Sequence, residues 1–295
     1  MLREFYMNIE TTRGAIRDYL DKALADQTHP NSKTLEAARY MTLNDFSGLY
    51  RPLLLLATAK GYSVSPGKAM PVAAAFEAIH VLSLIEDDMM DKSDTRRGKP
   101  ACHVVYGEDV ASLAHMLLRE VAEENIIERN RLSDRQRLTI ARLAFRTGKA
   151  MIYGQERDVL QRDLDSPEKV LRMYGGKTGA LIGAAIASGG IIGGACQEDI
   201  DTLHDIGTSI GVSYQIIDDA LDARASSKET GKPANQDSKK QTLIKIIGWD
   251  GVKREKSEKD REVDKLFPTL HGDHSILGDM IHHLRGKHEA YLSIA

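Results

Sequence analysis

Two groups of aspartates share the spacing Asp-Asp-x-x-Asp. The first group is Asp87, Asp88 and Asp91, and the second is Asp218, Asp219 and Asp222. On a helix, residues i and i+4 lie on one face, about 6 Å apart along the axis. Like charges at this spacing repel each other, and at a helix C-terminus they also oppose the helix dipole. Each group follows an apolar run typical of a buried helix. The pattern therefore indicates carboxylates that a bound cation holds together.

The chemistry of these side chains selects the cation. All of the candidate ligands are carboxylates, which suit Mg²⁺ or Ca²⁺ and disfavour zinc. Magnesium typically joins one or two carboxylates to the phosphates of a substrate, so a phosphate-bearing ligand is implied. One such group alone fits a solvated helix end equally well. Two groups, each ending a buried helix, favour the metal site.

Basic residues stand next to both acidic groups in the sequence. Arg96 and Arg97 follow the first group, Lys177 and Thr178 open a glycine-rich segment, and Lys232 follows the second group. Arginine matches phosphate oxygens with two parallel hydrogen bonds. Each cation alone resembles an ordinary surface residue. Their positions beside the carboxylates indicate a diphosphate site. The segment 155–158 fits a polar inner wall and simple surface pairing equally well.

Helical patterns dominate the chain. We expect helices over 10–26, 34–45, 52–59, 68–91, 108–130, 134–160, 166–195, 198–224 and 257–293. The segment 68–91 is apolar on every side, which is typical of a helix that runs through the core. No run alternates with period two long enough to predict a sheet. No linker or repeat divides residues 1–295, so we predict one all-α domain. The polar segment 225–242 is predicted to be a mobile loop, and its polarity is compatible with a lid over the substrate.

Composition excludes several classes of protein. The 295 residues carry 40 Lys and Arg against 43 Asp and Glu, a net charge of −3, which argues against a broad nucleic-acid surface. Two cysteines without metal-site spacing argue against disulfides and structural zinc, and favour the cytoplasm. Charges near the N-terminus argue against a signal peptide. The uncharged stretch 178–197 is as long as a membrane span, but its six glycines favour close helix packing, so no membrane span is predicted.

The motifs together resemble one family, the trans-isoprenyl diphosphate synthases or polyprenyl synthetases. The segment IHVLSLIEDDMMDKSDTRRGKP at 79–100 resembles the first aspartate-rich motif of that family, and YQIIDDALD at 214–222 resembles the second. Gly154-Gln155 with Asp158, Lys177-Thr178-Gly179, and Gly231-Lys232-Pro233 with Asp237 match the other signatures in order. The resemblance covers about residues 35–245.

The resemblance implies a fold and a set of roles. Members are large antiparallel helical bundles around a central cavity, usually homodimers. It implies that Asp87, Asp91 and Asp218 ligate magnesium directly, with Asp88, Asp219 and Asp222 in support, and that about three Mg²⁺ ions bind with the diphosphate. It implies that Arg96, Lys177, Thr178, Gln215 and Lys232 hold the allylic diphosphate. Isopentenyl diphosphate would be held by Arg51, His80 and Arg97.

The same resemblance implies a mechanism and a product. An allylic diphosphate ionises, isopentenyl diphosphate attacks the cation, and a proton is lost. In the family, an aromatic residue five positions before the first aspartate stops chain growth early. Here that position is Leu82, followed by Ser83, with Ile79 and Phe76 deeper on the same helix. We expect Phe76 to close the tunnel about 9 Å below Leu82, which favours a C20 product, with C15 second.

The sequence departs from the family pattern at the isopentenyl diphosphate site. Where the family has Gly-Lys-Arg-x-Arg-Pro, this chain has Ser-Gly-Leu-Tyr-Arg-Pro at 47–52, so that Gly48 and Leu49 replace two cations. Lys60 and Lys99 are the candidates to supply the missing charge. Glu86 also replaces a frequent histidine.

Two alternatives to a chain-elongating prenyltransferase remain open at this stage. A terpene-cyclase-like enzyme would ionise an allylic diphosphate without adding an isopentenyl unit, and the altered Gly48-Leu49 pair favours it. A non-catalytic subunit of a heteromeric synthase is disfavoured, because such a subunit would be expected to lose aspartates and this chain keeps all six.

Overall fold

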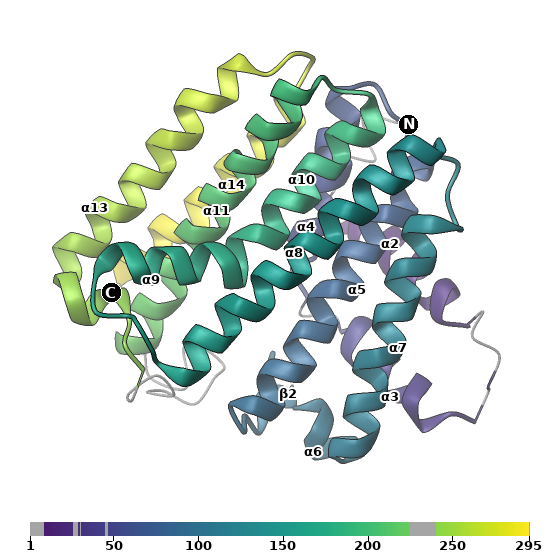
Figure 1. Cartoon of the computed structure of the whole chain (residues 1–295), viewed down its shortest axis with the longest axis horizontal. Coiled ribbons are helices and arrows are strands. Elements are labelled where there is room, and N and C mark those ends of the chain that lie inside the picture. The colour runs from purple at the N-terminus through teal and green to yellow at the C-terminus, as the bar shows by residue number, and fades with distance from the viewer. Residues whose placement is uncertain (1–8, 26–28, 30, 45–46, 225–239, 295) are drawn as a thin grey trace.

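The computed structural model describes residues 9–25, 29, 31–44, 47–224 and 240–294. The side chains of residues 222, 224 and 288–294 lie outside this description. Lys232 and Asp237, together with most of the predicted loop 225–242, also lie outside the described residues. The segments that the structure describes are almost entirely helical, which confirms the all-α prediction (Figure 1).

The first half of the chain builds one side of the bundle. The helices are α2 (Ile9–Ala25), α3 (Lys33–Thr42), α4 (Tyr50–Gly61), α5 (Pro66–Met90), α6 (Cys102–Tyr106) and α7 (Glu108–Ile127). A small hairpin of β1 (Thr95–Arg96) and β2 (Lys99–Pro100) follows α5. The sequence did not predict it. Arg97 and Gly98, the two turn residues, both have positive φ, at 52° and 73°, which is the geometry of tight hairpins.

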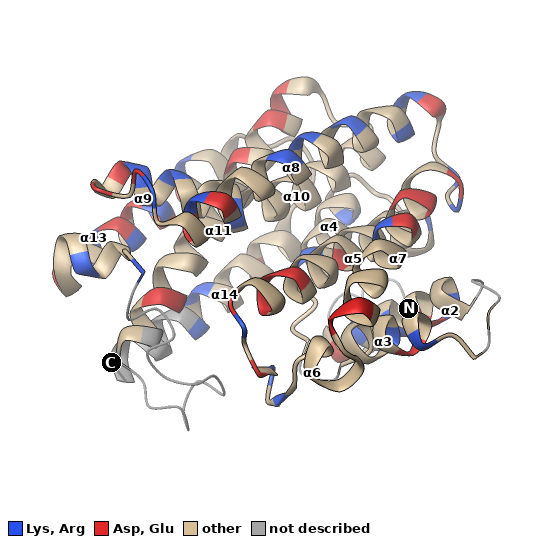
Figure 2. Cartoon of the chain, turned by 60° about the horizontal axis from the view of Figure 1, so that its bottom comes forward, with Lys and Arg blue, Asp and Glu red and all other residues tan. Residues whose placement is uncertain are grey.

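The second half contains the longest helices. They are α8 (Asp134–Leu160), α9 (Pro167–Tyr174), α10 (Ala180–Gly193), α11 (Gln197–Arg224), α13 (Leu243–Leu266) and α14 (Ser275–Ile294). Two expected helices are broken in the structure. The segment 166–195 is interrupted by a π-helical turn, η1 (Gly175–Gly179), and the expected helix 257–293 by a 3₁₀ turn, η2 (Phe267–Thr269), where Pro268 removes a backbone donor. Figure 2 shows acidic and basic residues interspersed along the helices.

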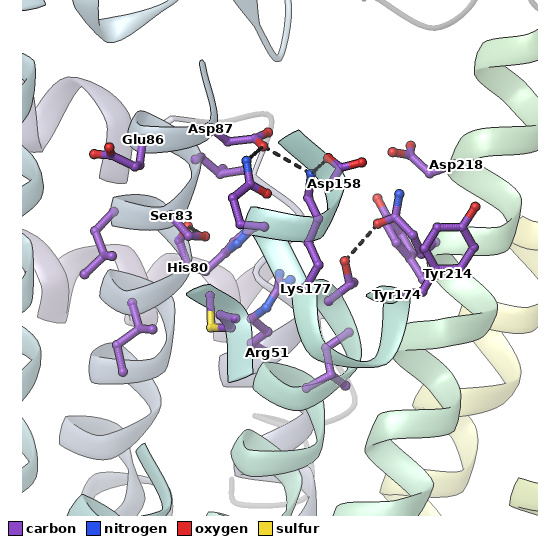
Figure 3. Close-up of a pocket in the computed structure, with 18 of the residues that line it drawn as sticks. Arg51, His80, Ser83, Glu86, Asp87, Asp158, Tyr174, Lys177, Tyr214 and Asp218 are labelled. Carbon is purple, nitrogen blue, oxygen red and sulfur yellow. Dashed lines mark hydrogen bonds and ion pairs between the residues drawn. The ribbon is translucent and has the colours of Figure 1, made fainter. Parts of the chain in front are cut away.

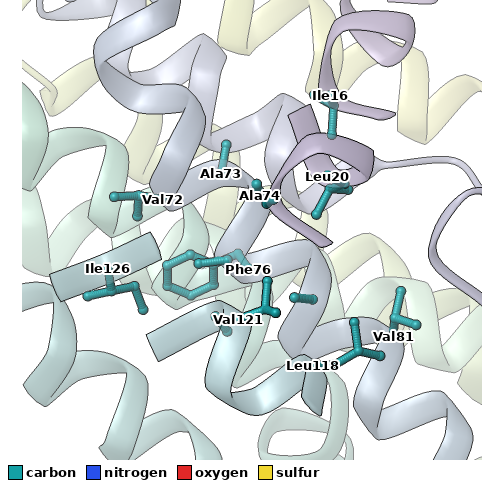
Figure 4. Close-up of a cluster of buried hydrophobic side chains, with 14 of the residues drawn as sticks. Ile16, Leu20, Val72, Ala73, Ala74, Phe76, Val81, Leu118, Val121 and Ile126 are labelled. Carbon is teal, nitrogen blue, oxygen red and sulfur yellow. The ribbon is translucent and has the colours of Figure 1, made fainter. Parts of the chain in front are cut away.

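Helix α5 runs through the core, as predicted. Its middle residues are buried on all sides, among them Val72, Phe76 and Val81, each fully buried. Figure 4 shows these side chains among residues of α2 and α7, including Leu20 and Leu118. Of the helices that the structure describes, α5 alone is long and apolar enough to cross a membrane, and 67% of that apolar window is buried inside the molecule. The uncharged stretch at 178–197 is divided between η1 and α10.

Helices α10 and α11 cross at a glycine contact, which explains the glycine-rich segment. A Cβ atom added to Gly207 of α11 would lie 2.6 Å from the Cα of Gly183 in α10, so backbone meets backbone. We expect Gly207→Ala to lower the free energy of unfolding by about 1–3 kcal/mol, the cost of overpacking a rigid contact. Gly14→Ala in α2 is the matched control, because nothing lies within 4 Å of its added Cβ. Urea denaturation of both variants checks this, and an unchanged Gly207→Ala midpoint contradicts it.

Candidate active site

One large cavity of about 1700 Å³ lies at the ends of α5 and α11. Its walls come mainly from α4, α5, α7, α8, α10 and α11, with the β1–β2 hairpin and η1, and with side chains from α2, α9 and α14. Both aspartate groups reach it. Figure 3 shows Asp87 and Asp218 on opposite sides of the cavity, with Lys177 and Asp158 between them. The two predicted carboxylate groups are therefore brought to one site.

The first aspartate group divides into two functions. Asp87 and Asp91 line the cavity, as the i, i+4 spacing predicts. Asp88 is fully buried and is not part of the cavity wall, because one residue along a helix turns the side chain by about 100°. Its Oδ1 atom accepts a hydrogen bond from Arg96 Nε at 2.8 Å, and Arg96 also donates to Asp87 Oδ2 at 3.1 Å. Asp88 therefore holds Arg96 in place and does not face the cavity, which is compatible with the supporting role that the resemblance implied.

The second aspartate group lies at the end of α11. Asp218 and Asp219 both line the cavity. Asp219 is largely buried and accepts hydrogen bonds from the Tyr174 hydroxyl and from Gln215 Nε2, the latter at 2.8 Å. Asp222 belongs to α11, and its side chain lies outside the described residues. Asp218 is therefore the carboxylate of this group that the described structure presents most directly opposite Asp87.

Two lysines link the carboxylates across the cavity. Lys177 Nζ lies 3.2 Å from Asp87 Oδ1 and 2.5 Å from Asp158 Oδ2. Lys240 Nζ lies 3.1 Å from both Asp91 Oδ2 and Asp158 Oδ2. Burial alone would lower the pKa of Lys177, but Asp87 and Asp158 outweigh it and raise that pKa. Lys177 is therefore a fixed cation at the centre of the site.

Asp87 is ionised throughout the physiological pH range. Burial alone would raise the pKa of Asp87, yet Lys177 and Arg96, with a hydrogen bond from Gln155, lower it to about 2. The Gln155 Nε2 atom donates to Asp87 Oδ1 at 2.9 Å. Gln155 therefore belongs to the inner wall, which decides between the two interpretations of the segment 155–158.

The donor set fits magnesium. The groups that face the cavity from α5 and α11 are carboxylate oxygens of Asp87, Asp91 and Asp218, which are the ligands that Mg²⁺ prefers. Lysines now balance these charges across a space wide enough for a ligand. The arrangement suits a cation that bridges carboxylates to phosphate oxygens.

The π-helical turn positions part of this site. Lys177 and Thr178 both lie within η1, where the wider turn changes the direction of side chains relative to an α-helix. Thr178 Oγ1 donates to Gln215 Oε1 at 2.8 Å, which connects η1 to α11. A hydroxyl, an amide and an ammonium group thus line one wall of the cavity together, as the resemblance implied.

A second polar pocket of the same cavity contains Arg51, His80 and Arg97. Burial, with Arg51 and Arg97 nearby, lowers the pKa of His80 well below its ordinary value, so its imidazole is neutral. Arg97 NH2 lies 3.3 Å from His80 Nε2. Glu77, buried beside these arginines, accepts a hydrogen bond from Ser47 Oγ at 3.0 Å. Arg51, His80 and Arg97, which the resemblance assigned to one substrate, are close together in the fold.

The sequence analysis missed three residues of the site. Glu77 was detectable, because an isolated charge inside an apolar helix needs a partner. Lys240 and Tyr174 gave no signal, since each resembles an ordinary residue of its segment. Lys60 and Lys99, the candidates for replacing the missing cations, do not line the cavity.

The apolar part of the cavity matches the chain-length prediction only in part. Ile79, Leu82 and Ser83 line the cavity, on one face of α5. Phe76 does not, because it is fully buried in the core against α7 (Figure 4). By spacing, Phe76 lies on the same face of α5 as Ile79 and Ser83. At the position of Phe76, however, that face packs against other core residues and does not reach the cavity. The prediction that Phe76 forms the tunnel wall is therefore corrected.

Comparisons with known proteins agree with this geometry. The family model for polyprenyl synthetase matches residues 33–267. The chain is 38% identical over 236 residues to the short chain isoprenyl diphosphate synthase of Methanothermobacter thermautotrophicus, covering 78% of this chain and 70% of that one. It is 37% identical over 230 residues to the heterodimeric geranylgeranyl pyrophosphate synthase large subunit 2 of Arabidopsis thaliana, covering 75% of this chain but only 61% of that protein.

Solved structures share the fold. The geranyltranstransferase of Thermotoga maritima superposes with a TM-score of 0.76 at 28% identity, covering 95% of this chain and 97% of that one. The geranylgeranyl pyrophosphate synthetase of Pyrococcus horikoshii gives a TM-score of 0.75 at 27% identity, covering 99% and 93%. The family model spans most of the chain and includes both aspartate groups. This chain therefore belongs to the polyprenyl synthetase family.

Proposed function

We propose that the protein is a trans-prenyltransferase that condenses isopentenyl diphosphate with an allylic diphosphate to give a short-chain polyprenyl diphosphate. The observation that carries the proposal is the position of Asp87 and Asp218 on opposite sides of one cavity, with Lys177 between them. Below these charges the cavity is lined by apolar side chains. The charged part of the cavity thus suits the diphosphate of a substrate, and the apolar part suits its isoprenoid tail.

The charged half of the cavity suits ionisation of the allylic substrate. Negative charge grows on the departing diphosphate as the allylic C–O bond breaks, and preorganised cations stabilise that charge. Lys177 and Arg96 line this part of the site, and Lys240 lies beside them. Mg²⁺ held by Asp87, Asp91 and Asp218 would neutralise diphosphate oxygens when bound. Lys232 is proposed as a further diphosphate ligand from the resemblance.

The second pocket suits isopentenyl diphosphate. Arg51 and Arg97 supply positive charge, and neutral His80 supplies a hydrogen-bonding group. The double bond of isopentenyl diphosphate attacks the allylic cation and forms the new C–C bond. The resulting cation loses a proton to the departed diphosphate, so the products are the longer allylic diphosphate and protonated diphosphate. The apolar walls exclude water, which would otherwise capture the cation.

We propose a C20 product. Leu82 lines the cavity and is not aromatic, so a chain is able to pass it toward Ile79. Several relatives carry the name geranylgeranyl pyrophosphate synthase, which supports this length. The names of these relatives describe synthases that make a prenyl diphosphate of defined length, so the terpene-cyclase-like alternative is not favoured.

A product assay tests the proposal. The protein is incubated with Mg²⁺, labelled isopentenyl diphosphate and either dimethylallyl, geranyl or farnesyl diphosphate, and the products are sized. Extension to C20 is the expected result, and EDTA should abolish it until Mg²⁺ is restored in excess. Cyclic or alcohol products without extension would support a cyclase, and no turnover with any primer would support a non-catalytic subunit.

We also propose a homodimer that packs through α7 and α8. Four apolar residues repeat every seven positions along α8 and are exposed: Leu138, Phe145, Ile152 and Val159. Exposed Leu113 and Met116 come from α7. Residues seven positions apart lie on one face of a helix, so these side chains form an exposed apolar stripe, the kind of seam through which two helices pack. Phe145, Ile152 and Val159 also belong to the cavity lining.

Two substitutions that introduce a negative charge test the dimer, and neither position lines the cavity. Leu113→Glu combined with Leu138→Glu is expected to convert the dimer to a monomer in light scattering at micromolar concentration. Arg254→Glu on exposed α13 is the control and should stay dimeric. A wild-type protein that is monomeric would contradict the proposed interface.

A further inference from the structure

The two cations that the chain lacks at positions 48 and 49 have no room to be restored locally. A Cβ atom added to Gly48 would lie 2.5 Å from Cε2 of the Tyr50 ring. Leu49 is 2% exposed, has a positive φ of 48°, and packs into the core at the start of α4. A lysine at 48 therefore collides with Tyr50, and an arginine at 49 would lose the buried leucine contact.

Two cations from distant parts of the chain reach the same place. Arg13 of α2 donates from Nε to the Gly48 carbonyl at 3.1 Å, and its guanidinium carbon lies 5.8 Å from the centre of the Tyr50 ring. Lys287 of α14 donates to the Tyr50 hydroxyl at 2.8 Å, and its Nζ lies 5.5 Å from the same ring centre. Both side chains line the same cavity as Arg51. The Tyr50 ring, which excludes a side chain at Gly48, thus contacts the two cations.

The pocket that contains Arg51, His80 and Arg97 has too little positive charge to balance a diphosphate without these cations. Arg51 and Arg97 lie near the buried carboxylate of Glu77, which offsets part of their charge. His80 is neutral. A diphosphate carries more than one negative charge, and a partly desolvated anion is stable only when enough cations pair with it. Arg51 and Arg97 alone fall short of that requirement.

We propose that Arg13 and Lys287 replace the two missing cations and bind the diphosphate of isopentenyl diphosphate, with Tyr50 as the positioning residue. This inference rests on the proposed function, because it assigns ligands to one of its two substrates. Arg13 forms an ion pair with exposed Glu10, and substrate phosphate competes with that surface pair at low cost. Cation–π contact with Tyr50 keeps both groups near the cavity mouth.

Single substitutions separate the two substrates. Arg13→Gln and Lys287→Gln are each expected to raise KM for isopentenyl diphosphate about 10-fold, the lower end for losing one charge-assisted hydrogen bond. KM for the allylic diphosphate should change less than about 2-fold, since its site lies at the aspartates. Lys287→Arg should retain near-normal KM. Lys60→Gln is the control, because Lys60 does not line the cavity.

Two further measurements make the inference independent of turnover. Calorimetric binding of isopentenyl diphosphate alone should weaken about 10-fold in Arg13→Gln. The same measurement on Lys287→Gln should show a similar weakening, and Lys287→Arg should bind nearly as the wild type does, because the charge is retained. Unchanged isopentenyl diphosphate affinity in both single variants, or equal weakening for both substrates, would overturn the inference. If the wild-type protein binds isopentenyl diphosphate but forms no chain-extended product, the proposed function is refuted instead.

Discussion

Replacing Asp218 with Asn is expected to lower kcat by about 10³-fold, the scale of removing a preorganised charge-stabilising group from an active site. Asp218 faces the cavity opposite Asp87, where the proposed function would have the two carboxylates hold magnesium. An amide keeps the shape of the side chain but loses its charge. Asp87→Asn is expected to have an effect of similar size, because Lys177 and Arg96 would then lack a shared counter-charge.

Steady-state assays at saturating substrates measure this effect. Asp201→Asn is the matched control, because Asp201 is an exposed carboxylate on the same helix, α11, and pairs only with Gln197 among the contacts described. Thermal unfolding should show that Asp218→Asn remains folded. A kcat within about 10-fold of wild type would remove Asp218 from the metal site.

Replacing Leu82 with Phe is expected to shift the main product from C20 to C15 or C10. Leu82 lines the cavity one turn above Ile79, and a helical turn is about 5.4 Å. A phenyl ring at position 82 projects further across the cavity than leucine. The growing chain would then meet the ring before its last extension, while the charged site that performs each condensation is unchanged.

Chromatography of the dephosphorylated products measures the shift. Phe76→Leu is the informative comparison, since Phe76 lies one turn beyond Ile79 but is packed in the core. It should lower the free energy of unfolding by about 1–3 kcal/mol and leave the product length unchanged. An unchanged product in Leu82→Phe would place the chain elsewhere in the cavity. A longer product in Phe76→Leu would restore Phe76 as the floor.

The proposed roles of Arg13 and Lys287 also concern the altered family motif at positions 47–52. The residues at positions 48 and 50 constrain each other, because a Cβ atom at position 48 would collide with the Tyr50 ring. A single reversion to lysine at position 48 is therefore expected to fail without a change at Tyr50. The pair has to change together.

The sequence by itself determined the helical class and the two carboxylate groups, while the roles of the charged residues came from the family resemblance. Local spacing carries that information: Asp87 and Asp91 share a helix face because they are four residues apart. An apolar helix such as 68–91 is buried whatever its neighbours are. The contact of Asp88 with Arg96 could not be predicted, because spacing alone does not say which side of a helix meets a cavity.

Only the tertiary structure decided which distant groups meet. Lys240 joins Asp91 and Asp158 across long stretches of chain, and Arg13 and Lys287 meet at Tyr50 from helices near opposite ends of the sequence. Contacts of this kind depend on how helices pack, and no local pattern encodes them. The depth of the cavity was decided in the same way, because packing against α7 buries Phe76 and leaves Ile79 in the wall.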